Sequence, residues 1–193
     1  MTTYTTQDAN PITWSELEML TDRLIASVSS YFENKNEKVD VIAPLLRTGG
    51  IIGGMLASKM KVVPMLPVQF KYSYNPLTSH QITSIPDMLV ELPESMNILL
   101  CEGNTSSGTL SKRAAAAIKE KYPHSKVYLA TLTRVYGGPE TLEGIEEIFH
   151  GIRTDENFKV DEETRGRLGL RTGITVFPWE DVAEEISEIN TLQ

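Results

Sequence analysis

The stretch ILLCEGNTSSGTL, residues 98–110, decides the fold that we expect for this chain. Its apolar start, Ile98 to Cys101, is typical of a buried strand, and the alanine-rich segment after it (110–122) is typical of a helix. At the carboxyl end of a parallel strand, a turn of small residues points its amides at incoming anions, so the stretch predicts a phosphate site. A plain strand-to-helix turn, rich in serine and threonine because these residues cap helices, is the alternative.

The segments around this stretch alternate between strand-like and helix-like patterns. Thr13 and Glu16 have the spacing of a capping box at the start of an amphipathic helix over 14–32. The other expected elements are strands over 39–43, 61–72, 97–101, 126–132, 145–150 and 174–177, and helices over 49–60 and 181–189. This alternation predicts an α/β fold with a parallel sheet and flanking helices, in a single domain over 1–193 that begins with an irregular segment over 1–12.

The charge and composition narrow the class of function. Eighteen basic and 26 acidic side chains give a formal net charge of −8, which disfavours nonspecific binding to nucleic acid. Cys101 is the only cysteine, so no disulfide forms within the chain and a reducing compartment suits it. The sequence has no apolar run long enough to cross a membrane, and its first residues lack the layout of a signal peptide. We therefore expect a cytoplasmic protein that binds neither nucleic acid nor membranes.

Residues 73–96 form a long polar segment with Pro76, Pro86 and Pro93 and no clear period. Loops of this length in compact domains are often functional, as lids or hairpins, and others are disordered. We expect this segment to be a flexible lid.

The stretch at 98–110 also resembles the loop that binds phosphoribosyl diphosphate (PRPP) in the type I phosphoribosyltransferases. That loop has an apolar strand, two acids, a variable stretch and then Thr-Gly-x-Thr. On this pattern Glu102 falls on the first acid, Gly103 on the second, and Ser107-Gly108 on Thr-Gly.

Three further segments agree with this resemblance in order and spacing. VDVIAPLLRTGGIIGGMLASKMKV (39–62) looks like the family's first strand, pyrophosphate loop and following helix. ITWSELEMLTDRLI (12–25) is similar to the first helix of bacterial and archaeal purine-type members, and ITVFPWE (174–180) to the ending of xanthine-type members. The resemblance covers roughly residues 13–185.

The resemblance implies a parallel-sheet core with the lid at 73–96 and a small C-terminal hood on the base side at 145–180. It implies transfer of a phosphoribosyl group from PRPP to a nitrogenous, purine-like base, with release of pyrophosphate. Mg²⁺ would be bound mainly through PRPP rather than by direct protein ligands, and the family's usual assembly is a homodimer.

The same resemblance assigns roles to single residues. Glu102 and Ser106 would be the catalytic positions. The 5′-phosphate would bind to Thr105, Ser106, Ser107, Gly108 and Thr109, the pyrophosphate to Arg47, Thr48, Gly49 and Gly50, and the base to Arg134, Ile174 and Phe177.

The departures from the family pattern raise an alternative function. Gly103 removes the second ribose-binding acid, Ser106 replaces the Asp of purine enzymes, and Leu110 replaces the last threonine of the loop. The alternative is a catalytically impaired module that binds PRPP or a nucleotide and serves regulation. If the missing acid alone weakens binding, changing Gly103 to Asp should tighten PRPP binding.

Other interpretations of the motifs stay open at this stage. Gly103 and Gly108 have the spacing of a nucleotide-binding P-loop, but Thr109 stands where that loop needs lysine, which disfavours an NTPase. Arg134 lies one residue short of the family's base-reading lysine, so a surface or structural role competes with base binding. Trp179 is more often a packing residue than a base stacker.

Overall fold

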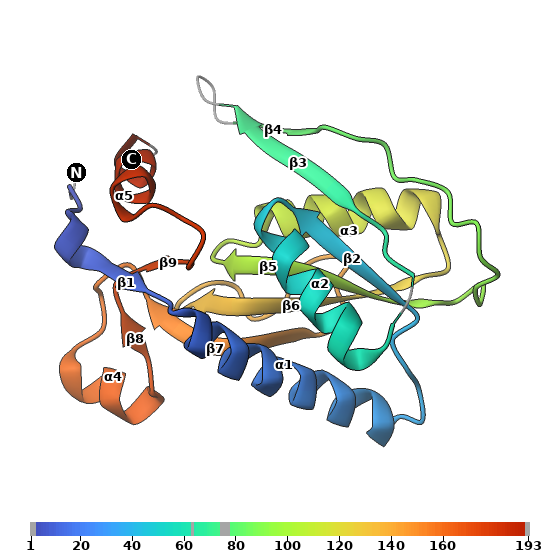
Figure 1. Cartoon of the computed structure of the whole chain (residues 1–193), viewed down its shortest axis with the longest axis horizontal. Helices are drawn as coiled ribbons and strands as arrows, with labels where there is room; N and C mark the ends of the chain where they lie inside the picture. The colour runs from blue at the N-terminus through green and yellow to red at the C-terminus, as the bar shows by residue number, and fades with distance from the viewer. Residues whose placement is uncertain (1–2, 63, 74–77, 192–193) are drawn as a thin grey trace.

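A seven-stranded, mostly parallel sheet forms the centre of the computed structural model, which describes residues 3–62, 64–73 and 78–191 (Figure 1). The strand order is β4-β3-β2-β5-β6-β7-β8, and only β3 and β4 pair antiparallel. The strands are β2 (Val41–Leu46), β3 (Val68–Ser73), β4 (Thr78–Gln81), β5 (Asn97–Thr105), β6 (Lys126–Val135), β7 (Ile148–Asp155) and β8 (Arg171–Thr172). The predicted α/β fold with a parallel sheet is confirmed.

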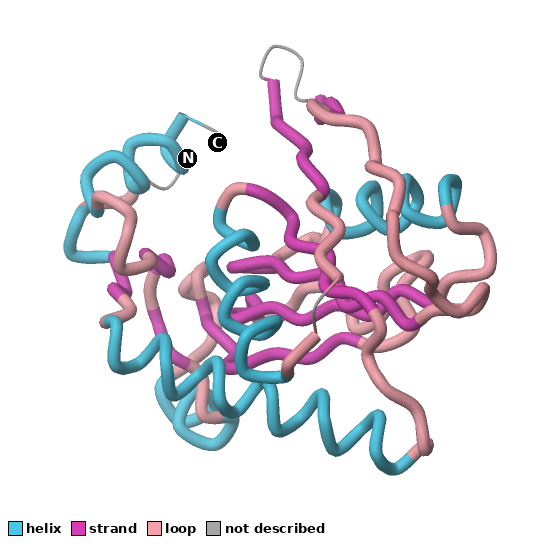
Figure 2. Tube along the Cα trace, turned by 45° about the vertical axis from the view of Figure 1, so that its right-hand side comes forward, coloured by secondary structure: helices cyan, strands magenta, loops and turns pink. Residues whose placement is uncertain are grey.

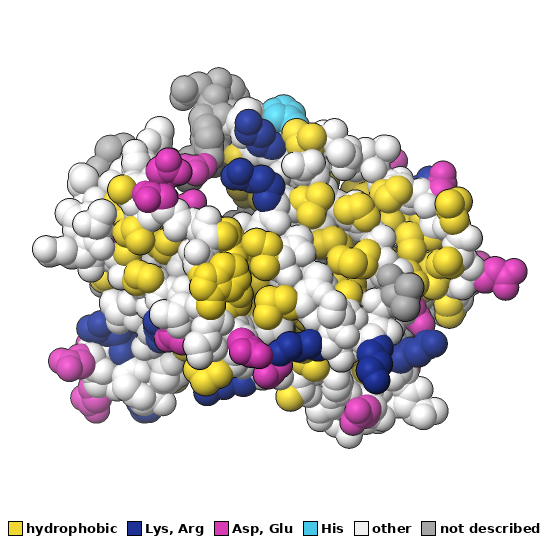
Figure 3. Space-filling view, in the orientation of Figure 1, with side chains coloured by type: hydrophobic (Ala, Val, Ile, Leu, Met, Phe, Trp, Pro, Cys, Tyr) yellow, Lys and Arg dark blue, Asp and Glu magenta, His cyan; other side chains and the backbone are white. Residues whose placement is uncertain are grey.

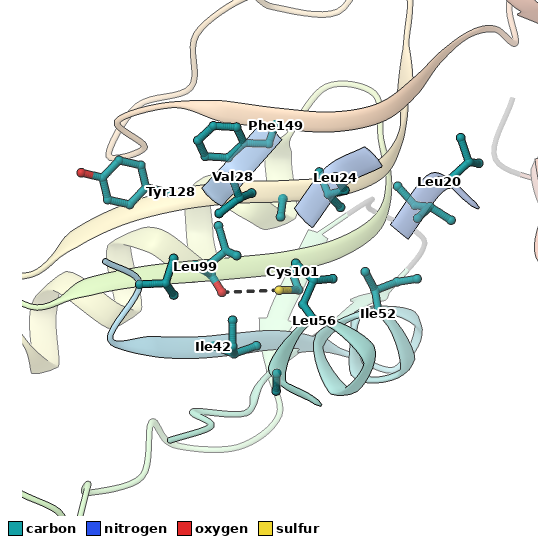
Figure 4. Packing of buried hydrophobic residues seen from close by; sticks show 14 of the residues in the cluster. Leu20, Leu24, Val28, Ile42, Ile52, Leu56, Leu99, Cys101, Tyr128 and Phe149 are labelled. Atoms are coloured by element: carbon teal, nitrogen blue, oxygen red, sulfur yellow. Dashed lines mark hydrogen bonds between the residues drawn. The ribbon is translucent and has the colours of Figure 1, made fainter. Parts of the chain in front are cut away.

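Helices cover both faces of this sheet. α1 (Trp14–Asn34) and α2 (Thr48–Met60) pack on one face, and α3 (Thr109–Lys121) packs on the other. Because side chains alternate along a strand, Leu99 and Cys101 of β5 belong to the core under α1 and α2, whereas Ile98 and Leu100 belong to the core under α3. Figure 4 shows Cys101 between the two helices on its face, with its thiol directed to the Leu99 carbonyl. The fully apolar strand at 98–101 is therefore buried on both faces.

The capping box predicted for α1 is confirmed. The Glu16 amide donates to the Thr13 hydroxyl at 3.2 Å, and the Glu16 carboxylate accepts from the Thr13 amide at 2.9 Å. This reciprocal pair satisfies two backbone donors that a helix start leaves open.

A small hood lies beyond the carboxyl ends of the parallel strands (Figure 1). It contains the two-stranded parallel sheet of β1 (Ala9–Pro11) and β9 (Ile174–Val176), together with α4 (Glu162–Leu168) and α5 (Val182–Thr191). Figure 2 shows both chain ends beside α5, where the amide and carbonyl of Tyr4 bond the side chain of Asn190. Of the expected hood segment 145–180, β7 and β8 instead belong to the main sheet.

Several expected boundaries differ from the observed ones. Residues 9–11 form a strand rather than the irregular segment expected over 1–12, because pairing with β9 orders a run too short to show a period. The acidic segment before Gly169 forms α4 because Asp161 caps its start, where its carboxylate accepts from the Thr164 amide at 2.8 Å. Part of the expected lid is ordered as β4, while residues 74–77 lie outside the described residues. None of the helices that the structure describes is long and apolar enough to cross a membrane.

Candidate active site

A cleft of about 240 Å³ opens where β2 and β5 end and where β9 and α5 approach them. Its walls come from four parts of the chain: residues 45–49, residues 102–104 with Leu110, Glu156, and hood residues between 174 and 189. The turn after β2 and the end of β5 therefore meet at one edge of the sheet, whereas the predicted phosphate-binding residues 105–109 are not among those that line the cleft. Carboxyl ends of parallel strands are the usual place for ligands in such folds.

No side chain of the turn between β5 and α3 caps the start of α3. Gly108 is the N-cap of α3 with a φ of 65°, and a Cβ there would lie 2.5 Å from the Leu142 side chain, so only glycine fits. Ser106 and Ser107 are exposed, and the Ser107 and Thr109 hydroxyls bond each other at 2.9 Å. The first N–H groups of a helix have no partner within the helix, and this turn carries no bulky side chain that would cover them.

Glu102 lines the cleft and is held by two hydroxyl groups. Its Oε2 accepts from the Thr105 hydroxyl at 2.6 Å and from the Ser111 hydroxyl on α3. Burial raises the pKa of the Glu102 carboxyl above its ordinary value, and these two hydrogen bonds oppose the rise. Both bonds go to Oε2, so Oε1 is the oxygen left for a ligand hydroxyl.

The position of the missing second acid, Gly103, is closed by its neighbours. A Cβ at residue 103 would overlap the Thr48 methyl group and would lie 3.0 Å from the Phe177 ring. A side chain at this position would have to displace the Thr48 methyl group and press against the Phe177 ring. This crowding opposes the tighter PRPP binding expected from Gly103→Asp, which stays a prediction.

The turn from β2 into α2 lies beside Glu102. The Leu46–Arg47 peptide bond is cis, and Arg47 is exposed at the N-cap of α2. A Cβ at Gly49 would overlap the Cys101 carbonyl oxygen, so a glycine there lets α2 start directly against β5. Arg47, Thr48 and Gly49 line the cleft.

Acidic side chains of the hood face this turn. Burial raises the pKa of Glu180, while hydrogen bonds from the Phe177 amide at 2.8 Å and from the Thr48 hydroxyl, and the charge of Arg47, lower it. Burial also raises the pKa of Glu185, and the negative charges of Glu180 and α5 raise it further. Figure 3 shows acidic side chains gathered at the upper left, where Figure 1 places α5. An anion that binds beside Arg47 would compete with these carboxylates.

Glu156 is a cleft residue that sequence reasoning missed. It follows β7, and its carboxylate accepts from the Asn104 amide group at 3.0 Å and from the Thr175 hydroxyl at 2.5 Å. Burial raises its pKa, and these hydrogen bonds oppose the rise. The available signal was its place just after a strand, but we expected that strand to end at residue 150.

The comparisons with known proteins concern the fold. No family model matches the sequence, and no curated protein matches it either. Among solved structures, the chain is similar to a purine phosphoribosyltransferase from Pyrococcus horikoshii (TM-score 0.65, 16% identity, covering 90% of this chain and 95% of that one). It is also similar to the xanthine-guanine-hypoxanthine phosphoribosyltransferase of Helicobacter pylori (TM-score 0.60, 14% identity, 93% and 99% covered).

This chain has the type I phosphoribosyltransferase fold. The chain is similar as well to a hypothetical protein from Neisseria gonorrhoeae with bound ppGpp (TM-score 0.56, 16% identity, 96% and 97% covered).

Of the three residues assigned to the base, two line the cleft and one does not. Ile174 and Phe177 line the cleft, and the Phe177 ring stacks on Trp179 with a centroid distance of 5.0 Å and an interplanar angle of 7°. Arg134 is not among the residues that line the cleft: it is buried, donates to the Pro139 carbonyl at 2.7 Å and pairs with Glu140. Trp179 therefore packs within the hood, and Arg134 orders the loop after β6.

Among the residues that the structure describes, there is no group of three or more Asp, Glu, His or Cys side chains that could hold a metal ion. Glu102 provides a carboxylate in the cleft, which suits a Mg²⁺ ion that keeps most of its ligands from a phosphorylated substrate.

Proposed function

We propose that this protein transfers a phosphoribosyl group from PRPP to a purine-like nitrogenous base and releases pyrophosphate. The observation that carries the proposal is the single cleft that joins the start of α2, the end of β5 with Glu102, and the hood residues Ile174 and Phe177. A phosphoribosyl donor needs sites for phosphate, ribose, pyrophosphate and base within reach of one another. The cleft has candidates for ribose, pyrophosphate and base, and the candidate for phosphate, the turn at 105–109, lies in the chain between the cleft residues Asn104 and Leu110.

The 5′-phosphate would bind to the turn formed by Thr105, Ser106, Ser107, Gly108 and Thr109. Open amides at the start of α3 and the positive end of the helix dipole favour an anion there. The exposed Ser106 and Ser107 hydroxyls can donate further hydrogen bonds.

The ribose and the leaving group would lie between this turn and α2. Glu102 would accept from a ribose hydroxyl, because Thr105 and Ser111 hold its carboxylate in one orientation. Arg47, Thr48, Gly49 and Gly50 would bind pyrophosphate, and Arg47 would then exchange its hood carboxylates for the ligand. Mg²⁺, held mainly by substrate oxygens beside Glu102, would supply positive charge that stabilises the leaving pyrophosphate.

The β3–β4 hairpin would exclude water during transfer. It already touches the helix that carries the phosphate turn: Tyr72 bonds the Thr109 hydroxyl, and Arg113 of α3 donates to Ser79 at 2.7 Å. Closing a site in this way protects the reacting carbon of the sugar from hydrolysis.

A pyrophosphate-release assay with PRPP, Mg²⁺ and a panel of bases tests the proposal. We expect release with at least one purine and a large loss of rate for Glu102→Gln. Glu33→Gln, an exposed change near the end of α1 outside the cleft, is the matched control and should keep the wild-type rate. Silence across purines, pyrimidines, nicotinate and nicotinamide would contradict the proposal.

A second candidate function is binding of PRPP or a nucleotide without turnover. The closed position at Gly103, which leaves Glu102 as the single acid for the ribose diol, favours it. The neighbour from Neisseria gonorrhoeae holds a nucleotide, ppGpp. Calorimetry that shows saturable PRPP binding, together with no PRPP consumption in the presence of any base, would select this candidate over the enzyme.

A further inference from the structure

The carboxylate of Glu156 has one saturated oxygen and one that is nearly free. Its Oε1 accepts from the Asn104 amide group, the Thr175 hydroxyl and amide, and the Thr154 hydroxyl, at 2.5–3.3 Å. Its Oε2 accepts from Asn104 at 3.2 Å, the only bond to this atom among the described residues. A carboxylate oxygen can accept two hydrogen bonds, so Oε2 offers an acceptor to a group that enters the cleft.

The surrounding network fixes this carboxylate rather than leaving it to rotate. The Thr133 hydroxyl bonds Asn104 Oδ1 at 3.0 Å, which orients the Asn104 amide with its nitrogen toward Glu156. Asn104 belongs to β5, Thr175 to β9 and Thr154 to β7, so three separate elements hold Glu156 against the wall of the cleft. A preorganised acceptor discriminates between ligands better than a mobile one.

The charge around the cleft also disfavours ligands that carry a negative charge. Glu102, Glu180 and Glu185 line it together with Glu156, and Arg47 is the single basic side chain among the lining residues, at the opposite, α2 side. A base with a negative charge would meet repulsion beside Glu156, and a carbonyl oxygen would face the carboxylate with no hydrogen between them.

We infer that Glu156 is a specificity-determining residue, which selects uncharged bases that carry an amino group and rejects acidic or purely carbonyl-edged bases. The inference rests on the proposed function because that function places the base beside Ile174 and Phe177, in the cleft that Glu156 also lines. It separates guanine- or adenine-like ligands from xanthine-, orotate- or nicotinate-like ones. The discriminating contact is one N–H of the exocyclic amino group donated to Oε2, at a ring position where the rejected base carries a carbonyl oxygen.

Binding of paired mononucleotides to the wild-type protein tests the inference without any variant. GMP and XMP differ in an amino group against a carbonyl on one purine position, and AMP and IMP differ in the same way on another. By calorimetry we expect the amino member of at least one pair to bind about ten times more tightly or more, and OMP to bind no more tightly than XMP. Equal or inverted affinities in both pairs would overturn the inference.

The variant Glu156→Gln tests directly whether Glu156 is the residue that discriminates between the bases. The amide oxygen can replace Oε1 in the network, while the amide nitrogen would present a donor where Oε2 presents an acceptor. We expect the amino-to-carbonyl affinity ratio to fall about tenfold or more. Glu185→Gln removes the same charge on the α5 side and should change the affinities of both members of a pair by the same factor. If Glu156→Gln leaves the ratio at the wild-type value, Glu156 does not read the base.

The outcomes distinguish this inference from the function on which it rests. Nucleotides that bind without ranking contradict the inference and leave the proposed function standing. A wild-type protein that binds neither PRPP nor any mononucleotide contradicts both. If Glu156→Gln does not fold, as a thermal unfolding scan would reveal, the ranking by the wild-type protein decides.

Discussion

Gly103 lies at a position in the cleft wall where neighbouring side chains leave no room for a Cβ. The space for a side chain is taken by the Thr48 methyl group and the Phe177 ring. We predict that Gly103→Ala lowers the free energy of unfolding by about 1–3 kcal/mol, because overpacking forces neighbours out of their positions. Urea denaturation followed by circular dichroism measures the change.

A second substitution checks the cause of that loss. Thr48→Ser removes the overlapping methyl group and keeps the hydroxyl that bonds Glu180. Gly103→Ala should therefore cost less in the Thr48→Ser background than in the wild type. An alanine at 103 that costs nothing in either background would mean that the hood packs elsewhere.

Glu102 should make stability depend on pH. Burial raises its pKa in the folded state above 4.5, so the folded state binds more protons than the unfolded state between those two values. Stability from this group is therefore highest at acidic pH and falls as pH rises from about 4.5 through the raised pKa. The melting temperature of the wild type minus that of Glu102→Gln should fall over this window and then level off. A difference that rises with pH would show that the pKa is lowered instead.

The start of α1 was predictable because its signal is local. Thr13 and Glu16 stand three residues apart, and their hydrogen bonds form within one turn. We predict that Thr13→Ala lowers the free energy of unfolding by about 1 kcal/mol, whereas Thr13→Ser keeps most of the cap. Chemical denaturation of both variants measures this, and equal stabilities of the two would argue against the cap as the cause.

The β3–β4 hairpin should depend on its contact with α3. Arg113→Ala and Ser79→Ala remove the two ends of one hydrogen bond at 2.7 Å. Each should speed hydrogen exchange of the β4 amides, and the double variant should exchange no faster than Arg113→Ala, because both changes break one link. Additive effects of the two changes would indicate that the hairpin is held by other contacts.

Element boundaries that depend on distant partners were less predictable than the start of α1. The sequence predicts β2 over 39–43, but it occupies Val41–Leu46, where β3 and β5 pair with it. Residues 9–11 are too few to show a strand pattern, and they form a strand because they pair with β9, which lies near the other end of the chain. Helix caps and apolar runs can be recognised from neighbouring residues. The ends of these strands cannot, because pairing with distant strands in the folded sheet determines them.

At the scale of the whole molecule, the cleft forms because the N-terminal and C-terminal segments pack against each other at one edge of the sheet. The hydrogen bonds between Tyr4 and Asn190 and the β1–β9 pairing bring α5 to the turn at Arg47. The turn at 105–109 and the glycine turn at 47–50 could be found in the sequence, since each is a short motif after an apolar strand. Glu156 and the acidic wall of α5 could not, because their role arises only where the hood meets β5.

The central claim is that this cleft holds a phosphoribosyl group between the start of α3 and the start of α2. A crystal structure of the protein with PRPP and Mg²⁺ tests it most directly. The account predicts the 5′-phosphate on the amides of residues 105–109, the ribose against Glu102, and the pyrophosphate beside Arg47. Density for PRPP outside the cleft, or a turn at 105–109 that stays empty while PRPP binds elsewhere, would contradict it.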